Sequence, residues 1–249
     1  MGWRNMRWKL FFGLTVWISC NPLEKDDGEP YQINEKIYEE SFDLADTSAW
    51  IIEAEDDVHL TDCVSDGAMD LSISKGITVW NTARFKGNVM FEFEVTVIEA
   101  GGANDRVSDL NCFWMATDPD FPDDFFQRSS WRGGKFWNYY SLNLYYVGYG
   151  GHDNSRTRLR KYDASVKPQP PVLAEYDDPL HLIEANKKNT IRIICFESRV
   201  IYFFNGEKVF DITDELPYTQ GYFGFRTTHN HMKVHHFKVF SLRSGDSRP

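Results

Sequence analysis

Apolar and polar residues alternate at every second position along several segments of this chain. The clearest segment is NVMFEFEVTVIEA, residues 88–100. Since successive side chains of a β-strand point to opposite faces, this period predicts a strand with one buried face. Helical periodicity is nearly absent. One face of the segment carries Val89, Phe91, Phe93, Val95 and Val97. The other face carries Met90, Glu92, Glu94, Thr96 and Ile98.

Other predicted strands are rich in aromatic and β-branched residues, and clusters of Gly, Asn, Asp and Pro separate them. Asn205-Gly206 lies between two such runs and is typical of a hairpin turn. Ten or more strands, no convincing long helix and an aromatic content of 16% predict an all-β, two-sheet antiparallel sandwich. The runs that carry this prediction are residues 109–117, 139–149, 189–213, 221–228 and 232–242.

The first nineteen residues have the pattern of a secretory signal. Arg4, Arg7 and Lys9 precede the apolar run LFFGLTVWIS, which is too short to span a bilayer. The following Ser19-Cys20 resembles the lipobox of bacterial lipoproteins, in which the cysteine is lipidated and becomes the new N-terminus. Trp17 departs from a strict lipobox, and an ordinary signal peptide cut elsewhere is the alternative.

These patterns divide the chain into a signal peptide at residues 1–19, a tether at 20–37 and a single domain at 38–249. The tether begins with NPLEKDDGEP, which resembles the acidic stretch that directs some lipoproteins to the outer surface; it is equally a plain polar linker. We therefore expect a protein anchored by lipid in the outer membrane, facing the cell surface or the periplasm.

The chain is acidic. Without residues 1–19 it keeps 24 basic and 37 acidic residues, a net charge of −13. Nucleic acid and anionic membrane surfaces are poor partners for such a chain. Membrane contact is therefore expected only through the lipid. We also expect a monomer. Three cysteines remain, Cys63, Cys112 and Cys195, an odd number that is not a disulfide framework. Cys112 and Cys195 lie in apolar strand-like runs, where we expect buried free thiols.

The order of strands in the C-terminal half resembles concanavalin A-like jelly rolls, with a strand, an Asn-Gly hairpin, a Gly-Phe-Arg strand and a final strand. A wider resemblance, over residues 38–243, is to a family of secreted bacterial proteins with YesU-like jelly rolls. It rests on VWNTARFKGNVMFEFEV, NDRVSDLNCFWMATDP, YYVGYGGHDNSRTRLRKYD and GYFGFRTTHNHM. The resemblance implies a role in polysaccharide utilisation, but the family supplies no settled catalytic residues.

Three arginines follow one another at alternate positions in the segment SRTRLRKYD, residues 155–163. Arg156, Arg158 and Arg160 are predicted to share one strand face, opposite Thr157 and Leu159. Like charges at alternate positions repel each other, so counter-charges are expected nearby. These are either carboxylates of the protein or an anionic ligand.

Polar and aromatic side chains at strand positions define the predicted ligand-binding face. Tyrosine faces stack on sugar rings, asparagine bonds hydroxyls and arginine recognises carboxylate or sulfate. In the strand before the arginines, we expect Asn143, Tyr145 and Tyr149 to point to the ligand and Leu144 and Tyr146 to point away. The predicted saccharide-binding residues are Asn111, Asn143, Asn154, Arg156, Arg158, Arg160, Arg226 and His231.

For an acidic polysaccharide the predicted chemistry is β-elimination, in which a uronate carboxylate is neutralised and the adjacent proton removed. Arg158 or Arg160 would neutralise the carboxylate. His152 or His229 would act as base, and Tyr145 or Tyr149 as acid. Two alternatives stay open. One is a lipoprotein that binds glycan without cutting it. The other is a hydrolase with a carboxylate pair, at Glu92 and Glu94 or at Asp105 and Asp109.

No cofactor is expected from the sequence. The acidic loop DPDFPDD offers hard oxygen ligands, so a structural Ca²⁺ is an alternative at Asp118, Asp120, Asp123 and Asp124. The histidines of the HNH segment and His235-His236 lack a known zinc spacing.

Overall fold

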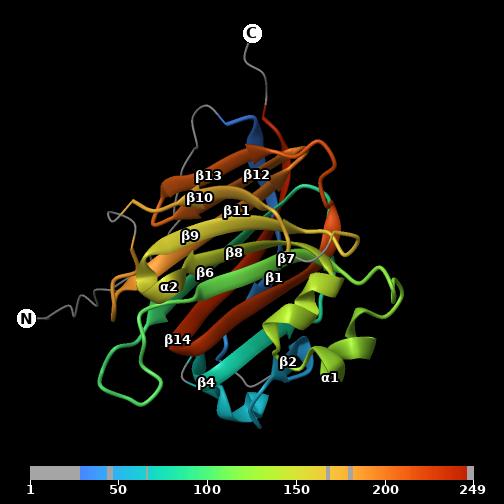
Figure 1. The fold of residues 1–249 in the computed structure, drawn as a ribbon. Coiled ribbons are helices and arrows are strands. Elements are labelled where there is room, and N and C mark those ends of the chain that lie inside the picture. The colour runs from blue at the N-terminus through green and yellow to red at the C-terminus, as the bar shows by residue number, and fades with distance from the viewer. Residues whose placement is uncertain (1–28, 44–46, 66, 167–168, 179–181, 246–249) are drawn as a thin grey trace, which may run out of the picture.

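The computed structural model describes residues 29–43, 47–65, 67–166, 169–178 and 182–245 (Figure 1). The predicted signal peptide and Cys20 lie outside these residues. Among the described residues, no helix is long and apolar enough to cross a membrane.

Fourteen strands account for most of the described residues, and the helices are only three to six residues long. The strands are β1 (Tyr31–Glu40), β2 (Trp50–Ala54), β3 (Val64–Ser65), β4 (Ala68–Asn81), β5 (Phe85–Lys86), β6 (Val89–Val97), β7 (Leu110–Thr117), β8 (Asn143–Gly150), β9 (Arg156–Tyr162), β10 (Val172–Tyr176), β11 (Lys188–Phe196), β12 (Arg199–Phe204), β13 (Glu207–Thr213) and β14 (Gln220–Ser244). The helices are η1 (Thr47–Ala49), η2 (Leu60–Asp62), η3 (Phe125–Arg128), α1 (Ser129–Arg132), η4 (Phe136–Ser141) and α2 (Gly151–Asn154).

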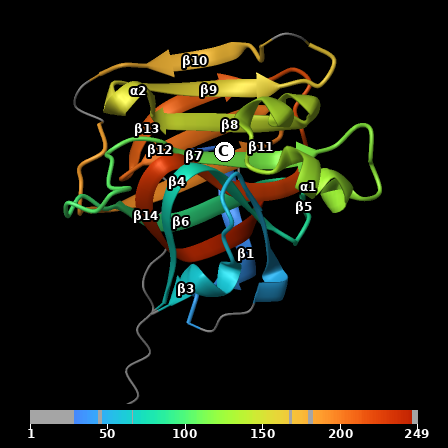
Figure 2. The ribbon, with the colours of Figure 1, turned by 60° about the horizontal axis from the view of Figure 1, so that its bottom comes forward.

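Strand β14 belongs to both sheets of the sandwich. Its first half pairs with β7 and β4, and its second half pairs with β6 and β1. The first sheet runs β10-β9-β8-β7-β14-β4, with β2 and β3 added beside β4, and the second runs β13-β12-β11-β6-β14-β1 (Figure 1, Figure 2). All pairings are antiparallel, as predicted.

The main core fills the space between the two sheets. It takes alternate residues of each strand, including the predicted apolar face of β6. Cys112 and Cys195 are buried free thiols, as predicted, and Cys63 is a buried free thiol as well. Burial raises the pKa of Cys63 to about 11 and that of Cys195 to about 12. The Asn205-Gly206 hairpin is also confirmed: both residues have positive φ and join β12 to β13.

Two boundaries differ from the sequence prediction. The segments 221–228 and 232–242, predicted as separate strands, are one continuous strand. Bulges at His229 and His236, both with positive φ, bend the strand as it passes from one sheet to the other. Strand β1 starts at Tyr31 and pairs with the end of β14, so residues 31–37 of the predicted tether belong to the second sheet.

A second apolar cluster covers the outer face of the first sheet. Residues 118–142, hereafter the covering segment, contain η3, α1 and η4 and lie across this face (Figure 1, Figure 2). Phe125, Tyr139 and Leu142 of the segment pack on side chains of β4, β7, β8 and β9. Because of this cover, the first sheet has apolar residues on both faces.

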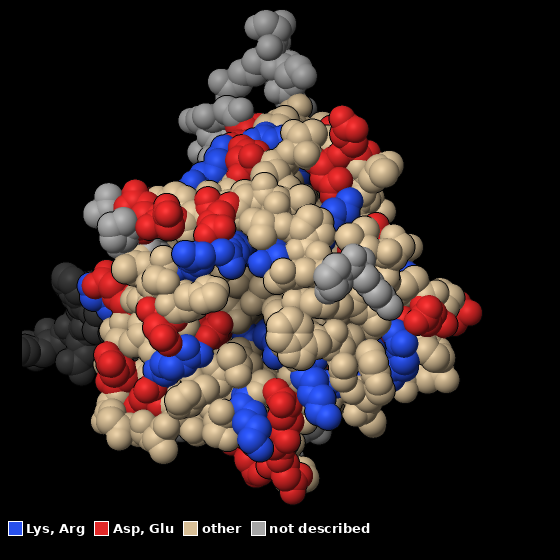
Figure 3. All heavy atoms as spheres, in the orientation of Figure 1, with Lys and Arg blue, Asp and Glu red and all other residues tan. Residues whose placement is uncertain are grey.

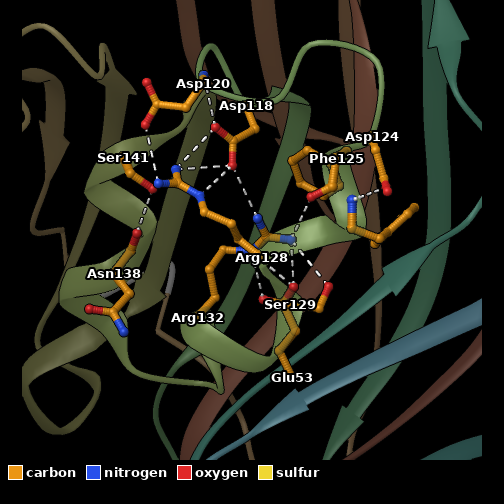
Figure 4. Close-up of polar contacts among 11 residues, drawn as sticks. Glu53, Asp118, Asp120, Asp124, Phe125, Arg128, Ser129, Arg132, Asn138 and Ser141 are labelled. Carbon is orange, nitrogen blue, oxygen red and sulfur yellow. Dashed lines mark hydrogen bonds and ion pairs between the residues drawn. The ribbon is translucent and has the colours of Figure 1, made fainter.

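A buried ionic network fixes the covering segment to the sandwich (Figure 4). Arg132 is fully buried, and its Nε donates to both carboxylate oxygens of Glu53 in β2, at 2.9 and 3.1 Å. Its Nη1 donates to Asp118 at 3.4 Å, and Asp118 also accepts from Arg128. Buried charges are stable only when they are paired, so this network determines where the segment lies.

Candidate functional site

A cavity of about 510 Å³ lies between the covering segment and the outer face of the first sheet. Figure 3 shows a hollow in this region, below the row of basic side chains over β9. The cavity is lined by Glu55, Asp109, Asn111, Lys135, Phe136, Trp137, Asn138, Tyr146, Arg226 and Thr228.

One row of directly paired residues crosses the first sheet at the cavity. Strand pairing places Arg226 opposite Asn111, and Asn111 opposite Gly148. Gly148 is paired with Arg158, and Arg158 with Glu175. Directly opposite residues share a sheet face. The sheet thus brings together three of the predicted binding residues, Asn111, Arg158 and Arg226, from three different strands.

Arg226 is deeply buried, with 3% of its surface exposed. Its Nη1 donates to Thr78 Oγ1 at 3.1 Å and to the carbonyl oxygen of Gly134 at 2.8 Å. The guanidinium carbon lies 5.2 Å from the ring centre of Phe136 and 5.1 Å from that of Tyr139, which are cation–π distances. These contacts fix the orientation of the guanidinium at the cavity floor.

Asn111 and Asp109 supply oxygen atoms beside this guanidinium. Asn111 is 4% exposed; its Nδ2 donates to Asp109 Oδ1 at 3.3 Å, while its Oδ1 has no hydrogen-bond partner among the described residues. Asp109 also accepts from Ser108 Oγ and pairs with Arg106, which additionally donates to the Thr228 carbonyl. A buried acceptor left unpaired in a cavity wall is a binding position for a hydroxyl group.

The helix η4 and the residues before it form the outer wall. Lys135 and Trp137 are exposed, and Trp137 shows 70% of its surface. The sequence patterns do not single out Phe136, Trp137, Asn138 or Glu55. For Phe136, Trp137 and Asn138 the sequence does contain an indication, the aromatic run KFWNYY. Its large apolar residues lie in a segment without strand alternation.

The arginine row of β9 has the predicted geometry. Arg156, Arg158 and Arg160 share the outer face, and Thr157 and Leu159 face inward. The counter-charge is in part the protein's own, because Glu175 of β10 pairs with Arg158 at 3.0 Å and with Arg156 at 3.5 Å. Arg160 donates to the Pro170 carbonyl at 2.6 Å.

The predicted face of β8 is wrong. Tyr145 and Tyr149 are fully buried in the core between the sheets, whereas Leu144 and Tyr146 lie on the outer face. Tyr145 donates to Asp214, and burial raises its pKa far above the ordinary value. The alternation was predicted correctly, but with apolar residues on both faces it did not show which face is inside. Tyr146 is the tyrosine that lines the cavity.

Four other predicted residues lie outside the cavity lining. His152 is exposed in the turn of α2, and His229 is exposed at the bulge of β14, next to the lining residue Thr228. Asn154 makes two hydrogen bonds with the backbone of Ile183. Asn143 accepts a hydrogen bond from the Ala164 amide. Both asparagines therefore order loops.

His231 lines a separate cavity of about 390 Å³. Its two ring nitrogens each lie 2.9 Å from a carboxylate oxygen, one of Asp105 and one of Asp70. Asp105 accepts hydrogen bonds from the backbone amides of Ala100 and Gly102 and contacts His231, and these contacts lower its pKa to about 2. The two carboxylates predicted as a pair thus lie in different places: Asp105 contacts His231, and Asp109 lines the cavity of about 510 Å³.

Four of the remaining predicted carboxylates pair with basic side chains. Glu92 pairs with Arg192 at 3.1 Å and Glu94 with Lys188 at 2.7 Å, on the outer face of the second sheet and away from the cavity. In the acidic loop, Asp118 and Asp120 pair with Arg128 (Figure 4). The Asp124 carboxylate caps η3. Within the described residues, no cluster of three or more His, Cys, Asp or Glu side chains is arranged to hold a metal ion.

Residues 71–237, which include every cavity residue except Glu55, match the family described as "Domain of unknown function (DUF6250)". The chain belongs to this family. No curated protein matches the chain significantly.

Solved structures share the fold at low sequence identity. A protein of unknown function with a galectin-like fold from Bacillus subtilis is 19% identical with a TM-score of 0.70, covering 86% of this chain and 100% of its own. An endo-β-1,3-glucanase from Pyrococcus furiosus is 10% identical with a TM-score of 0.58, covering 88% and 97%. The exoplasmic/lumenal domain of VIP36, in a Ca²⁺/Man3GlcNAc-bound form, is 13% identical with a TM-score of 0.54, covering 81% and 87%. These similarities confirm the predicted jelly roll.

Proposed function

We propose that this protein binds a saccharide chain in the cavity between the covering segment and the first sheet. The observation that carries the proposal is the pairing of an exposed aromatic wall with a polar floor. Trp137 presents its ring to solvent at the rim, and Asn111 and Asp109 present oxygen atoms below. Aromatic faces pack on the C–H faces of sugar rings, and fixed acceptors select hydroxyl positions.

The jelly-roll neighbours support this proposal by what their names state. One is an endo-β-1,3-glucanase, another a β-glucanase of Bacillus licheniformis, and a third was solved with Man3GlcNAc. Fold alone does not fix function, so the proposal rests on the cavity residues.

Trp137→Ala tests the aromatic wall. We expect about a tenfold loss of affinity for the saccharide that binds, because removal of a stacking ring costs about 1–1.5 kcal/mol. The unfolding free energy should change by less than about 0.5 kcal/mol, since the side chain is exposed. Affinity is measured by calorimetry after a screen against oligogalacturonate, glucuronoxylan, xylan and β-glucan oligosaccharides.

Trp131→Ala is the matched control, because Trp131 is also exposed on the covering segment but does not line the cavity. Equal effects of the two substitutions, or no effect of Trp137→Ala on a saccharide that does bind, would place the binding site elsewhere.

Cleavage of the bound chain is the second candidate function. The carboxylates of Glu55 and Asp109 line the cavity and favour hydrolysis, while Arg226 and Tyr146 are groups that β-elimination uses. No histidine is among the described lining residues, so the bases predicted from sequence are not in the cavity wall. Unsaturated products that absorb in the ultraviolet would identify a lyase. Reducing ends without that absorbance would identify a hydrolase, and binding without products would leave the capture role.

From the N-terminal pattern we propose that a lipid on Cys20 holds this saccharide-binding chain at a membrane surface. We expect the full chain to incorporate labelled palmitate when expressed in a Gram-negative host and to fractionate with the outer membrane. Cys20→Ser should abolish both. Release of the wild-type chain as an unlabelled protein into the periplasm or medium would instead indicate an ordinary signal peptide.

A further inference from the structure

We infer that Arg226 is the recognition residue for an anionic group of the bound saccharide, a carboxylate or a sulfate. This inference rests on the proposed function, because it concerns the same cavity. It adds the chemical class of the ligand and the residue that selects it.

Arg226 forms no ion pair with a described residue. Among the described residues, no carboxylate lies within the ion-pair distance of 4.0 Å of its guanidinium, although only 3% of the residue is exposed. By contrast Arg132, within the covering segment, is buried with two carboxylates. An arginine stays protonated in proteins, and a buried cation without a partner is unfavourable. Two aromatic rings compensate this charge in part.

The free donors of Arg226 have a fixed orientation. Nη1 is used by Thr78 and Gly134, whereas Nε and Nη2 have no hydrogen-bond partner among the described residues. Nε and Nη2 form one edge of the guanidinium, and this edge binds two oxygens of a carboxylate or sulfate side-on. Because Nη1 is already fixed, the free edge is preorganised for such a ligand.

The cavity lining supplies further polar groups. Asn111 is directly opposite Arg226 in the neighbouring strand, and its unpaired Oδ1 accepts from a hydroxyl. Directly opposite side chains start about 5 Å apart, which suits an acidic group and a hydroxyl of one sugar ring. Lys135 adds a second positive charge to the lining.

Two carboxylates also line the cavity, and their negative charge opposes the binding of an anion. Asp109 is neutralised by its ion pair with Arg106. Glu55 accepts a hydrogen bond from the Gly76 amide at 3.2 Å and has no ion pair with a described residue. Glu55 is exposed to solvent, so its charge is screened, but it opposes an anionic ligand. Its removal therefore provides an independent test.

The experiment compares ligands that differ only in charge. Oligogalacturonate is matched with its fully methyl-esterified form, and a sulfated galactan oligosaccharide with its desulfated form, by calorimetry at fixed salt. We expect the wild-type chain to bind one acidic member at least tenfold more tightly than its neutral counterpart. The pair that shows the difference identifies carboxylate or sulfate as the anion.

Arg226→Gln should weaken binding of that acidic ligand by roughly 10- to 100-fold and binding of the neutral one by less than about threefold. Arg192→Gln, which removes an equal charge from the outer face of the other sheet, is the control and should leave both affinities unchanged. Glu55→Gln should tighten binding of the acidic ligand several-fold relative to the neutral one. Since Glu55 is exposed, this variant decides the question even if Arg226→Gln does not fold.

Equal binding of charged and neutral ligands, with both weakened by Trp137→Ala, would overturn the role of Arg226 and leave saccharide binding intact. An unchanged preference for the acidic ligand in a folded Arg226→Gln variant would also overturn it, as would Glu55→Gln without effect on acidic binding. Absence of binding by all saccharides would instead reject the proposed function itself.

Discussion

Replacing Arg132 with methionine is expected to lower the free energy of unfolding by about 3–5 kcal/mol. Arg132 is fully buried, and its removal leaves the Glu53 carboxylate charged and without its partner inside the protein. Asp118 keeps Arg128 as partner, so the cost falls mainly on Glu53. Chemical denaturation followed by tryptophan fluorescence and circular dichroism measures the change.

Arg199→Met is the matched control for this prediction. Arg199 also pairs with two carboxylates, Glu29 and Asp211, but at the surface, where ion pairs contribute about 1 kcal/mol or less. In addition, the double substitution Glu53→Leu with Arg132→Met should recover most of the stability lost by Arg132→Met alone, since the unpaired buried charge is then gone.

Arg132→Met is also expected to lose saccharide affinity, because the cavity residues Lys135, Phe136 and Trp137 come shortly after Arg132 in the covering segment. A loss of stability below about 1 kcal/mol, equal to that of Arg199→Met, would contradict the idea that this network fixes the segment.

Gly134→Ala is expected to lower the unfolding free energy by about 2–5 kcal/mol. Gly134 has φ of +73°, which costs a residue with a side chain about 1–2 kcal/mol. A Cβ there would also lie 2.3 Å from the carbonyl oxygen of Gly76 and 2.8 Å from the Ala54 Cα. Such an overlap with backbone adds about 1–3 kcal/mol, because neither atom can move away alone.

Gly87→Ala separates the two contributions. Gly87 has a similar φ of +79°, but a Cβ there would meet no atom within 4 Å. We expect this control to cost only the conformational part, about 1–2 kcal/mol. Only Gly134→Ala should also reduce saccharide binding, since the Gly134 carbonyl fixes the Arg226 guanidinium. Equal stability losses in both variants would show that the contact between the covering segment and β4 is not tight.

Local alternation was informative wherever the two faces of a strand differ in chemistry. In β9, arginines at alternate positions stand opposite Thr157 and Leu159, and the predicted outer face is the observed one. In β8 both faces are apolar, so the same reasoning placed Tyr145 and Tyr149 toward the ligand when they lie in the core. The pattern indicates that neighbouring side chains face opposite ways, but only polarity shows which way is inward.

The covering segment could not be recognised in advance. Its helices are only four to six residues long, too short for a helical period to appear. Because the sequence does not reveal this segment, it predicts neither the cavity wall nor the aromatic rim that contains Trp137. The arginine partners of the acidic loop, Arg128 and Arg132, lie later in the chain, so the sequence of the loop does not show these ion pairs.

The sequence by itself determined the β-sandwich class, the hairpin at Asn205-Gly206, the buried thiols and the face of the arginine row. Each of these depends on residues that are close along the chain. Only the tertiary structure decided that Asn111 and Arg226 meet at one cavity floor, that Glu175 neutralises part of the arginine row, and that Arg226 has no carboxylate partner among the described residues. The contacts involved join residues far apart, such as Arg132 with Glu53, 79 positions away, and Arg226 with Gly134, 92 positions away. Charge pairing and cavity shape arise from such contacts, and no local pattern encodes them.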